Sequence, residues 1–177
     1  MDVQAYSATL ASALSTPRAY ERSTRQRIVA RAREWVRAVT PAVSDLLAYE
    51  AVASASALSA PESFARLVEE GSLTSLAATD ADLANAKASA QPRLDAASAT
   101  LTRYYGGVYF SYTQALELDA LLAAIDHQPD SPAEATLVAA VLGTASDLVA
   151  TVGSHFAQPS RLRDRSGVVK PAVAARV

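Results

Sequence analysis

The residues of this chain best suited to a chemical role lie near its C-terminal end, where basic side chains follow one another closely. Arginine forms bidentate, charge-assisted hydrogen bonds with phosphate oxygens, and a flexible basic segment can follow a phosphate backbone and become ordered on binding. An exposed terminus that binds nothing would have the same composition, so both interpretations stay open. The residues that we expect to contact nucleic acid, if this segment binds one, are His155, Gln158, Arg161, Arg163, Arg165 and Lys170.

A cluster of aromatic residues surrounds two adjacent glycines at 104–112. Exposed rings beside glycine can stack on a base or wedge into a duplex. Buried rings would instead anchor a loop onto helices, and we favour this interpretation for the cluster as a whole. Tyr109 and Tyr112 are the members that we expect to contact nucleic acid if any of them does.

A second set of basic residues lies at 18–39, where seven arginines accompany Ile28, Ala32, Trp35 and Val36. The apolar residues recur at helical spacing. The pattern predicts a long helix with one apolar stripe and an arginine-rich outer surface. That surface could bind phosphates, but arginines spread around most of a helix more often face solvent or a partner than a DNA groove. We favour the interpretation as a solvated helix face.

The sequence contains no pattern typical of a catalytic or metal site. There is no cysteine, which excludes disulfides and thiolate metal sites. His155 has no Asp or His nearby at metal-ligand spacing, and His127 reads as a surface turn residue. Two histidines alone do not define a Ser-His-Asp group. We therefore expect no catalytic residue and no metal ligand in this chain.

The elements that would carry these residues are all helical. An alanine-rich, glycine-poor composition favours helix, because Ala has the best intrinsic propensity. Pro92 should kink or split the helix that contains it, and Gly71 and Gly153 should end helices. Helix starts are predicted from capping residues and first-turn prolines at Thr40-Pro41, at Ser59 with Glu62, at Thr79 or Asp80, at Ser111 with Gln114, and at Ser131-Pro132 with Glu134.

The sequence thus predicts an all-α fold, a single helical domain of six or seven helices over 1–153, which begins with a short helix at 2–14. An irregular basic tail at 154–177 follows it. No apolar run approaches the ~20 residues that cross a bilayer, and the N-terminus does not read as a signal peptide. We expect a cytoplasmic protein without a membrane association. The net charge of -2 gives no indication of nucleic-acid binding, so only the distribution of charge can do so.

Two blocks of sequence carry a resemblance to a known family. The first is Tyr-Gly-Gly-Val-Tyr-Phe-Ser at 105–111 with the residues at 114–121 that follow it, and the second is 145–159, which ends in His-Phe-Ala-Gln-Pro. Together they resemble the middle of a DNA adenine-N6 methyltransferase of the D12 class, over roughly residues 100–170. The resemblance implies the part of such an enzyme that recognises its DNA target.

In D12-class enzymes of the alpha arrangement, a methyl-donor motif precedes this region and an Asp-Pro-Pro-Tyr-type motif follows it. Neither motif occurs in the 177 residues. Methyl transfer to an exocyclic amine needs the flipped base held and its nitrogen polarised, with the donor methyl aligned in line. We therefore expect no methyltransferase activity from this chain alone, and S-adenosylmethionine would be bound by a catalytic partner.

The resemblance also suggests a weak donor contact at Asp2, where the family has an acid that contacts the donor ribose; a helix N-cap is the alternative role. We expect a target-recognition segment or subunit of a split or truncated restriction-modification methyltransferase, which positions DNA for a catalytic core on another chain. The alternative is an all-helical protein-protein interaction module or homodimer with no nucleic-acid role. A degraded remnant with exposed apolar surface is a third interpretation.

Overall fold

The computed structural model describes residues 18–57, 59–125, 132–148 and 163–169 of the chain. This part of the chain is all-α and contains no strand, only two isolated bridges, Gly106 with Phe110 and Arg163 with Val169. The predicted fold class, a single helical domain, is confirmed. The elements are α2 (Arg18–Val39), the 3₁₀ helix η1 (Thr40–Ala42), α3 (Ser44–Ala55), α4 (Pro61–Glu70), α5 (Ala81–Ala96), α6 (Thr100–Tyr105), α7 (Tyr112–Ala124) and α8 (Pro132–Leu148).

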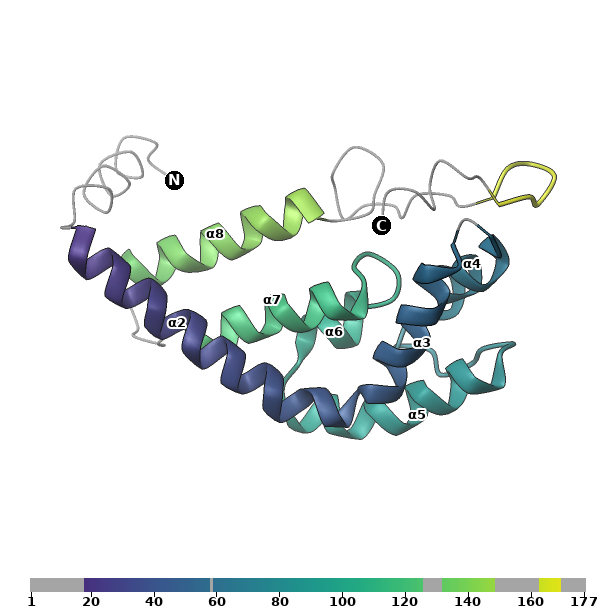
Figure 1. Ribbon diagram of the computed structural model, residues 1–177, viewed down its shortest axis with the longest axis horizontal. Helices are drawn as coiled ribbons and strands as arrows, with labels where there is room; N and C mark the ends of the chain where they lie inside the picture. Colours follow the sequence, from purple (N-terminus) through teal and green to yellow (C-terminus); the bar gives the residue numbers. More distant parts are fainter. Residues whose placement is uncertain (1–17, 58, 126–131, 149–162, 170–177) are drawn as a thin grey trace.

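Helix α7 occupies the centre of the molecule, with α2 on one side of it and α8 on the other (Figure 1). The apolar stripe of α2, which includes Ile28 and Trp35, packs on Ala120 and Ala124 of α7. On the other side, Leu118 packs in a cluster with residues of α8 such as Val141. The stripe predicted from spacing at 18–39 is therefore the surface that attaches α2 to the domain.

Helices α3, α4 and α5 form the other end of the molecule (Figure 1). Leu46 of α3, Leu67 of α4 and Leu83 of α5 belong to one buried cluster. The first turn of α7 enters this cluster through Tyr112 and Leu116. Helix α7 thus contributes to the cores at both ends of the domain, and α2 does so as well through Trp35 and Val39.

Two of the predicted helix starts, those of α5 and α7, are confirmed together with their side-chain caps. Asp80 accepts hydrogen bonds from the backbone N–H groups of Asp82 and Leu83 at the start of α5. Ser111 and Gln114 form the predicted reciprocal capping box of α7. At Ser59 the prediction was wrong: α4 has Ala60 as its N-cap and no side-chain cap bond. The Ser59 hydroxyl instead donates to the Ser56 carbonyl, 3.3 Å away, in the preceding turn.

The effect of two prolines also differs from the prediction. Helix α5 continues through Pro92 to Ala96, because Ala90 and Leu94 are buried beside it and their packing offsets the lost backbone bond. The interruption comes later, at Ser98, whose φ is 56°. Thr40 does not cap a new helix: its hydroxyl donates to the Val36 carbonyl at 2.7 Å, which completes α2, and α3 begins only at Ser44.

Candidate nucleic-acid interface

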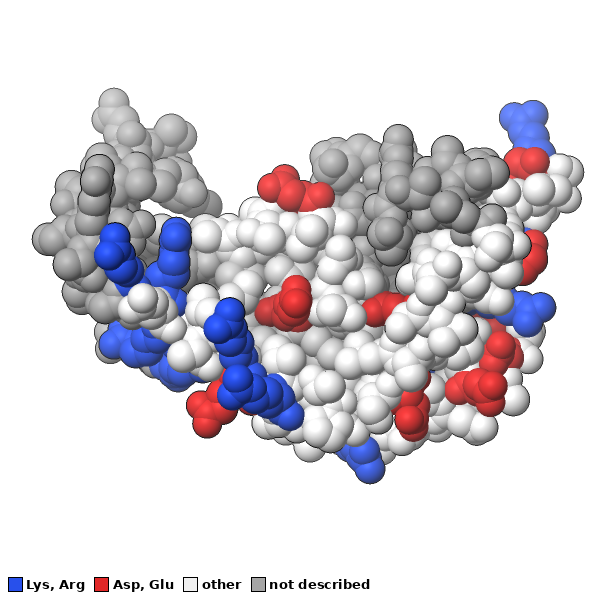
Figure 2. Space-filling model, in the orientation of Figure 1, with Lys and Arg blue, Asp and Glu red and all other residues white. Residues whose placement is uncertain are grey.

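The arginines of α2 lie on the side of the helix that faces away from α7. All of the described arginine side chains of this helix are exposed, and only Glu34 opposes their charge among the described side chains of α2. Figure 2 shows these basic side chains gathered along α2, at the left of the molecule. They are Arg22, Arg25, Arg27, Arg31, Arg33 and Arg37.

The rest of the molecule has the opposite balance of charge. Between residues 40 and 125, ten carboxylates accompany only four basic side chains, Arg66, Lys87, Arg93 and Arg103. Acidic side chains are accordingly spread over the end of the molecule formed by α3, α4 and α5 in Figure 2. The small net charge of the chain therefore conceals two poles of opposite sign, and α2 is the positive one.

Only Arg163 and Arg165 of the C-terminal residues predicted to contact nucleic acid lie within the described part of the chain. The Arg163 guanidinium is engaged by α4: Nε donates to Glu69 at 2.7 Å and Nη2 donates to Glu62 at 2.9 Å. Another hydrogen bond, from Nη1, goes to the Gly167 carbonyl at 3.0 Å. Arg163 is therefore occupied by internal carboxylates in the positions that phosphate oxygens would take, whereas Arg165 is exposed.

Residues 163–169 of the predicted tail contact the helical domain. Val169 is 5% exposed and packs in a cluster with Phe64 and Ala65 of α4. The guanidinium contact raises the pKa of Arg163, and it lowers the pKa of Glu62 because the carboxylate accepts its hydrogen bonds. Residues 163–169 are thus attached to the helical domain. His155, Gln158, Arg161 and Lys170 lie outside the described residues, as do Asp2, His127, Gly153 and the helix predicted at 2–14.

Tyr112 does not face solvent, which corrects its predicted role as a contact for nucleic acid. Its side chain is fully buried and its hydroxyl donates to the Gly71 carbonyl. Burial and the nearby Glu50 carboxylate raise the pKa of Tyr112. Contact with a base would require this ring to leave the core, so Tyr112 is a packing residue.

The other aromatic residues of 104–112 take different positions. Tyr109 is half-buried and meets Tyr105 edge-to-face, with the ring centroids 5.7 Å apart, while Phe110 is buried. Tyr104 is 48% exposed, and the Arg103 guanidinium lies 5.1 Å from its ring centroid. The cluster mainly anchors its loop to the core, as favoured from the sequence, and Tyr104 is its most accessible member.

Two buried carboxylates hold this region together, and neither was identified from the sequence. Asp119 of α7 accepts hydrogen bonds from the backbone N–H groups of Leu101 and Thr102, at 2.9 and 2.8 Å, and so caps α6. Burial raises the pKa of Asp119, and these bonds act in the opposite direction. Glu50 of α3 does the same for the first turn of α7 at Tyr112 and Thr113. Since both partners are distant in sequence, no local pattern could have indicated them.

Lys87 of α5 is a buried cation with a structural role. Its side chain is fully buried, and Nζ donates to the carbonyls of Glu70 and Ala77. Burial lowers the pKa of Lys87, while the nearby Glu70 carboxylate raises it. One acceptor is the last residue of α4 and the other lies within the 71–80 connection, so Lys87 fixes this connection onto α5.

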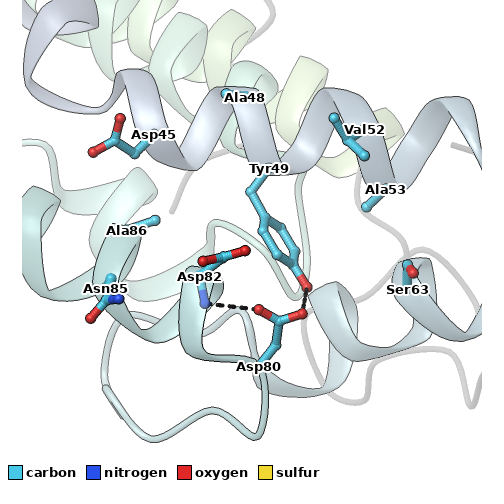
Figure 3. Close-up of a pocket in the computed structure, with 10 residues that line it drawn as sticks. All are labelled: Asp45, Ala48, Tyr49, Val52, Ala53, Ser63, Asp80, Asp82, Asn85 and Ala86. Atoms are coloured by element: carbon cyan, nitrogen blue, oxygen red, sulfur yellow. Dashed lines mark hydrogen bonds between the residues drawn. The ribbon is translucent and has the colours of Figure 1, made fainter.

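A groove of about 600 Å³ lies between α3 and α5, with Ser63 of α4 at its edge. Figure 3 shows Tyr49 reaching from α3 to Asp80 at the start of α5, and the two side chains are joined by a 3.1 Å hydrogen bond. Burial and this bond raise the pKa of Tyr49 to about 12. The bonds from the first turn of α5 and from Tyr49 lower the pKa of Asp80. The groove is lined mainly by carboxylates and small apolar residues. The lining residues are Asp45, Ala48, Tyr49, Val52, Ala53, Ser63, Asp80, Asp82, Asn85 and Ala86.

In the part of the chain that the structure describes, no group of three or more His, Cys, Asp or Glu side chains could hold a metal ion. Within the same ranges, none of the helices has the length and apolar character that crossing a membrane requires. No family model, no curated protein and no solved structure matches this chain.

Proposed function

We propose that this chain binds DNA, as the target-recognition segment of a D12-like adenine-N6 methyltransferase, and that α2 supplies its main phosphate-binding surface. The observation that carries the proposal is the concentration of exposed arginines on α2 in a molecule whose other described charged residues are mostly acidic. Phosphate contacts supply most of the affinity of a protein for DNA and position it on the duplex. The resemblance of residues 100–170 to the D12 class supports DNA as the nucleic acid.

The arrangement of the arginines suits a phosphate backbone. Arg27 and Arg31, four residues apart, share one edge of α2, and Arg33 and Arg37 share another, since helical neighbours recur at this spacing. From Arg22 to Arg37 the helix advances by about 22 Å, at ~1.5 Å per residue. That length matches roughly six base steps of ~3.4 Å, so several arginines of α2 can reach phosphates of one duplex.

In this proposal the C-terminal basic residues have a secondary role. Arg163 already binds Glu62 and Glu69, which leaves Arg165 as the accessible basic side chain of 163–169. The methyl donor and the Asp-Pro-Pro-Tyr-type motif would belong to another chain, which would bind S-adenosylmethionine. The protein described here would orient the DNA for that partner.

The test is duplex binding by fluorescence anisotropy over a range of salt concentrations. Each phosphate contact contributes about −0.9 to the slope of log K against log salt. The Arg27→Gln/Arg33→Gln variant should bind several-fold more weakly and with a slope less negative by about 2. Arg93→Gln removes an exposed arginine of α5 and should leave both quantities unchanged.

Binding that is insensitive to salt, or equal loss in the α2 and α5 variants, would contradict the assignment of α2. No binding to any duplex, together with a stable dimer in light scattering, would favour the alternative of a helical interaction module. The expectation that the chain alone has no methyltransferase activity has its own test, because methyl incorporation into DNA by the purified chain would contradict it.

A further inference from the structure

We propose a second interaction surface that is independent of DNA: the groove between α3 and α5 accepts the arginine-rich helix α2 of a second copy of this chain. The groove is open to solvent and bordered by carboxylates: Asp45 on α3 lies at one end of it, and Asp82 of α5 and its N-cap Asp80 lie below Tyr49 (Figure 3). Both Asp45 and Asp82 are exposed. A partner for this groove must therefore bring positive charge.

The groove also offers apolar surface, which a cation alone does not need. Val52 is 71% exposed at its edge, and Ala48 and Ala86 line it from the two helices. An arginine side chain matches such a site, since its alkyl stem covers apolar surface while its guanidinium bonds to carboxylates. An arginine of α2 can insert in this way, and Ala30, which is exposed between Arg27 and Arg33, permits close approach of the helix.

Charge complementarity within the described residues points to α2 as the occupant. Helix α2 is their most basic element, and the groove lies in the acidic part of the molecule. The apolar stripe of α2, including Ile28 and Trp35, holds the helix along α7. The arginines from Arg22 to Arg33 are therefore fixed on their own chain, and meeting a groove requires another copy.

This contact joins two different surfaces, so it is heterologous. A heterologous contact that does not close into a ring produces open chains whose length grows with concentration. The low net charge of the molecule, -2, adds little repulsion between copies. Self-association through α2 also occupies the arginines assigned above to DNA, so DNA and a second copy would compete.

The association is measured by sedimentation velocity and light scattering on the whole chain. At roughly 30 mM salt, where charges interact over about 20 Å, the average mass should exceed the 18.5 kDa of one chain and rise with concentration. At roughly 500 mM salt it should return to that of the single chain. A mass that stays at 18.5 kDa in both conditions overturns the proposal.

Charge-reversed variants distinguish this geometry from a symmetric dimer. Asp45→Lys/Asp82→Lys reverses the charge of the groove, and Arg27→Glu/Arg33→Glu reverses the charge of the helix. Each variant alone should remain monomeric. Their equimolar mixture should associate again and grow beyond twice the chain mass, because the unmodified helix meets the unmodified groove and the two reversed surfaces are complementary as well, whereas a symmetric dimer would stop at twice the chain mass. A mixture that stays single, or variants that still associate alone, would overturn the proposal.

The matched control is Glu117→Lys/Asp147→Lys, which makes the same charge change at exposed positions on α7 and α8, and it should associate like the unmodified chain. Helical circular dichroism confirms folding, and Asp45→Asn/Asp82→Asn is the milder variant if the lysines unfold the groove. Added duplex DNA should dissociate the assemblies into monomers only if the proposed function also holds. Association that DNA does not disturb would refute DNA binding by α2 and leave the groove contact standing.

Discussion

Glu50 of α3 accepts the hydrogen bond of the Tyr112 backbone N–H at the first turn of α7, 62 residues further along the chain. The same carboxylate accepts bonds from Thr113, at 3.1 Å from its backbone nitrogen and 3.0 Å from its hydroxyl. A negative charge at a helix N-terminus is stabilised by the unpaired N–H groups there. This contact joins the central helix to the core formed by α3, α4 and α5.

Replacing Glu50 with Ala should destabilise the protein by about 3 kcal/mol, because buried backbone N–H groups lose a charged acceptor. Urea denaturation followed by circular dichroism measures the loss. Thr113→Ala, which removes only the hydroxyl bond, should cost about 1 kcal/mol or less. Equal losses in the two variants would show that the carboxylate does not cap α7.

Gly107 is the position in the 106–110 loop that a side chain fits least. Its φ is +79°, and an added Cβ would lie 2.8 Å from the Tyr112 hydroxyl oxygen and 2.9 Å from the Gly71 backbone. Gly107→Ala should therefore destabilise the fold by about 2–4 kcal/mol, from the left-handed conformation and the steric clash together. Thermal and urea unfolding both report this change.

Gly143 of α8 is the control for the same substitution. A Cβ there would have no atom within 4 Å, and Ala is the better helix former by about 1 kcal/mol. Gly143→Ala should thus stabilise the protein slightly, opposite in sign to Gly107→Ala. Similar effects in both variants would mean that the contact between Gly107 and Gly71 does not constrain the loop.

Local features of the fold were predictable from the sequence, since their partners are close along the chain. The apolar stripe of α2, the Asp80 cap and the Ser111-Gln114 capping box each depend on residues within a few positions of one another. Contacts between distant residues were not predictable. Glu50 and Asp119 resemble surface acids in the sequence, and only the packing of α3, α6 and α7 makes them caps.

The candidate site shows the same division. The arginine surface of α2 follows directly from helical spacing, whereas the carboxylate partners of Arg163 are 94 and 101 residues away. Tyr112 stands at the first position of a helix whose start was predicted, but its burial depends on the distant Gly71. The groove between α3 and α5 has no sequence signature, because its walls come from separate helices.

Arg163→Ala should release residues 163–169 from α4. The Glu62 and Glu69 carboxylates would lose their cation, and Val169 would become more exposed. Hydrogen exchange should show faster exchange at Val168, whose backbone N–H is bonded to Asp164 in this turn, with little change in α7. Arg165→Ala, at an exposed neighbouring position, should leave the exchange rates unaltered.

The Arg163 contact should also respond to acid. Because its partner lowers the pKa of Glu62 in the folded state, the stabilisation is present above the ordinary glutamate pKa of about 4.3 and is lost as the pH falls through the folded value. Exchange at Val168 in the unmodified protein should therefore accelerate below about pH 4. An exchange rate that is independent of pH in this range, after correction for intrinsic chemistry, would show that the ion pair does not hold the turn.

Tyr49→Phe should reduce the loss of stability at alkaline pH. The folded state raises the pKa of Tyr49 to about 12, above the value of about 10 in an unfolded chain. Its contribution is thus fully present below pH 10 and is lost as the pH rises through about 12. Lys87 has the opposite effect: because its pKa is lowered in the folded state, its contribution to stability increases as the pH rises. This increase ends near pH 10.4, where the unfolded lysine loses its proton.

Urea denaturation between about pH 10.5 and 12 therefore isolates the tyrosines. The unmodified protein should lose stability steadily over this window, and Tyr49→Phe should lose distinctly less, although some loss persists because the pKa of Tyr112 is raised as well. Tyr104→Phe, at a tyrosine that is 48% exposed, should follow the unmodified protein. If Tyr49→Phe and Tyr104→Phe have the same pH dependence, the bond between Tyr49 and Asp80 does not couple α3 to α5, and the groove between these helices lacks the rigid wall that binding a second copy requires.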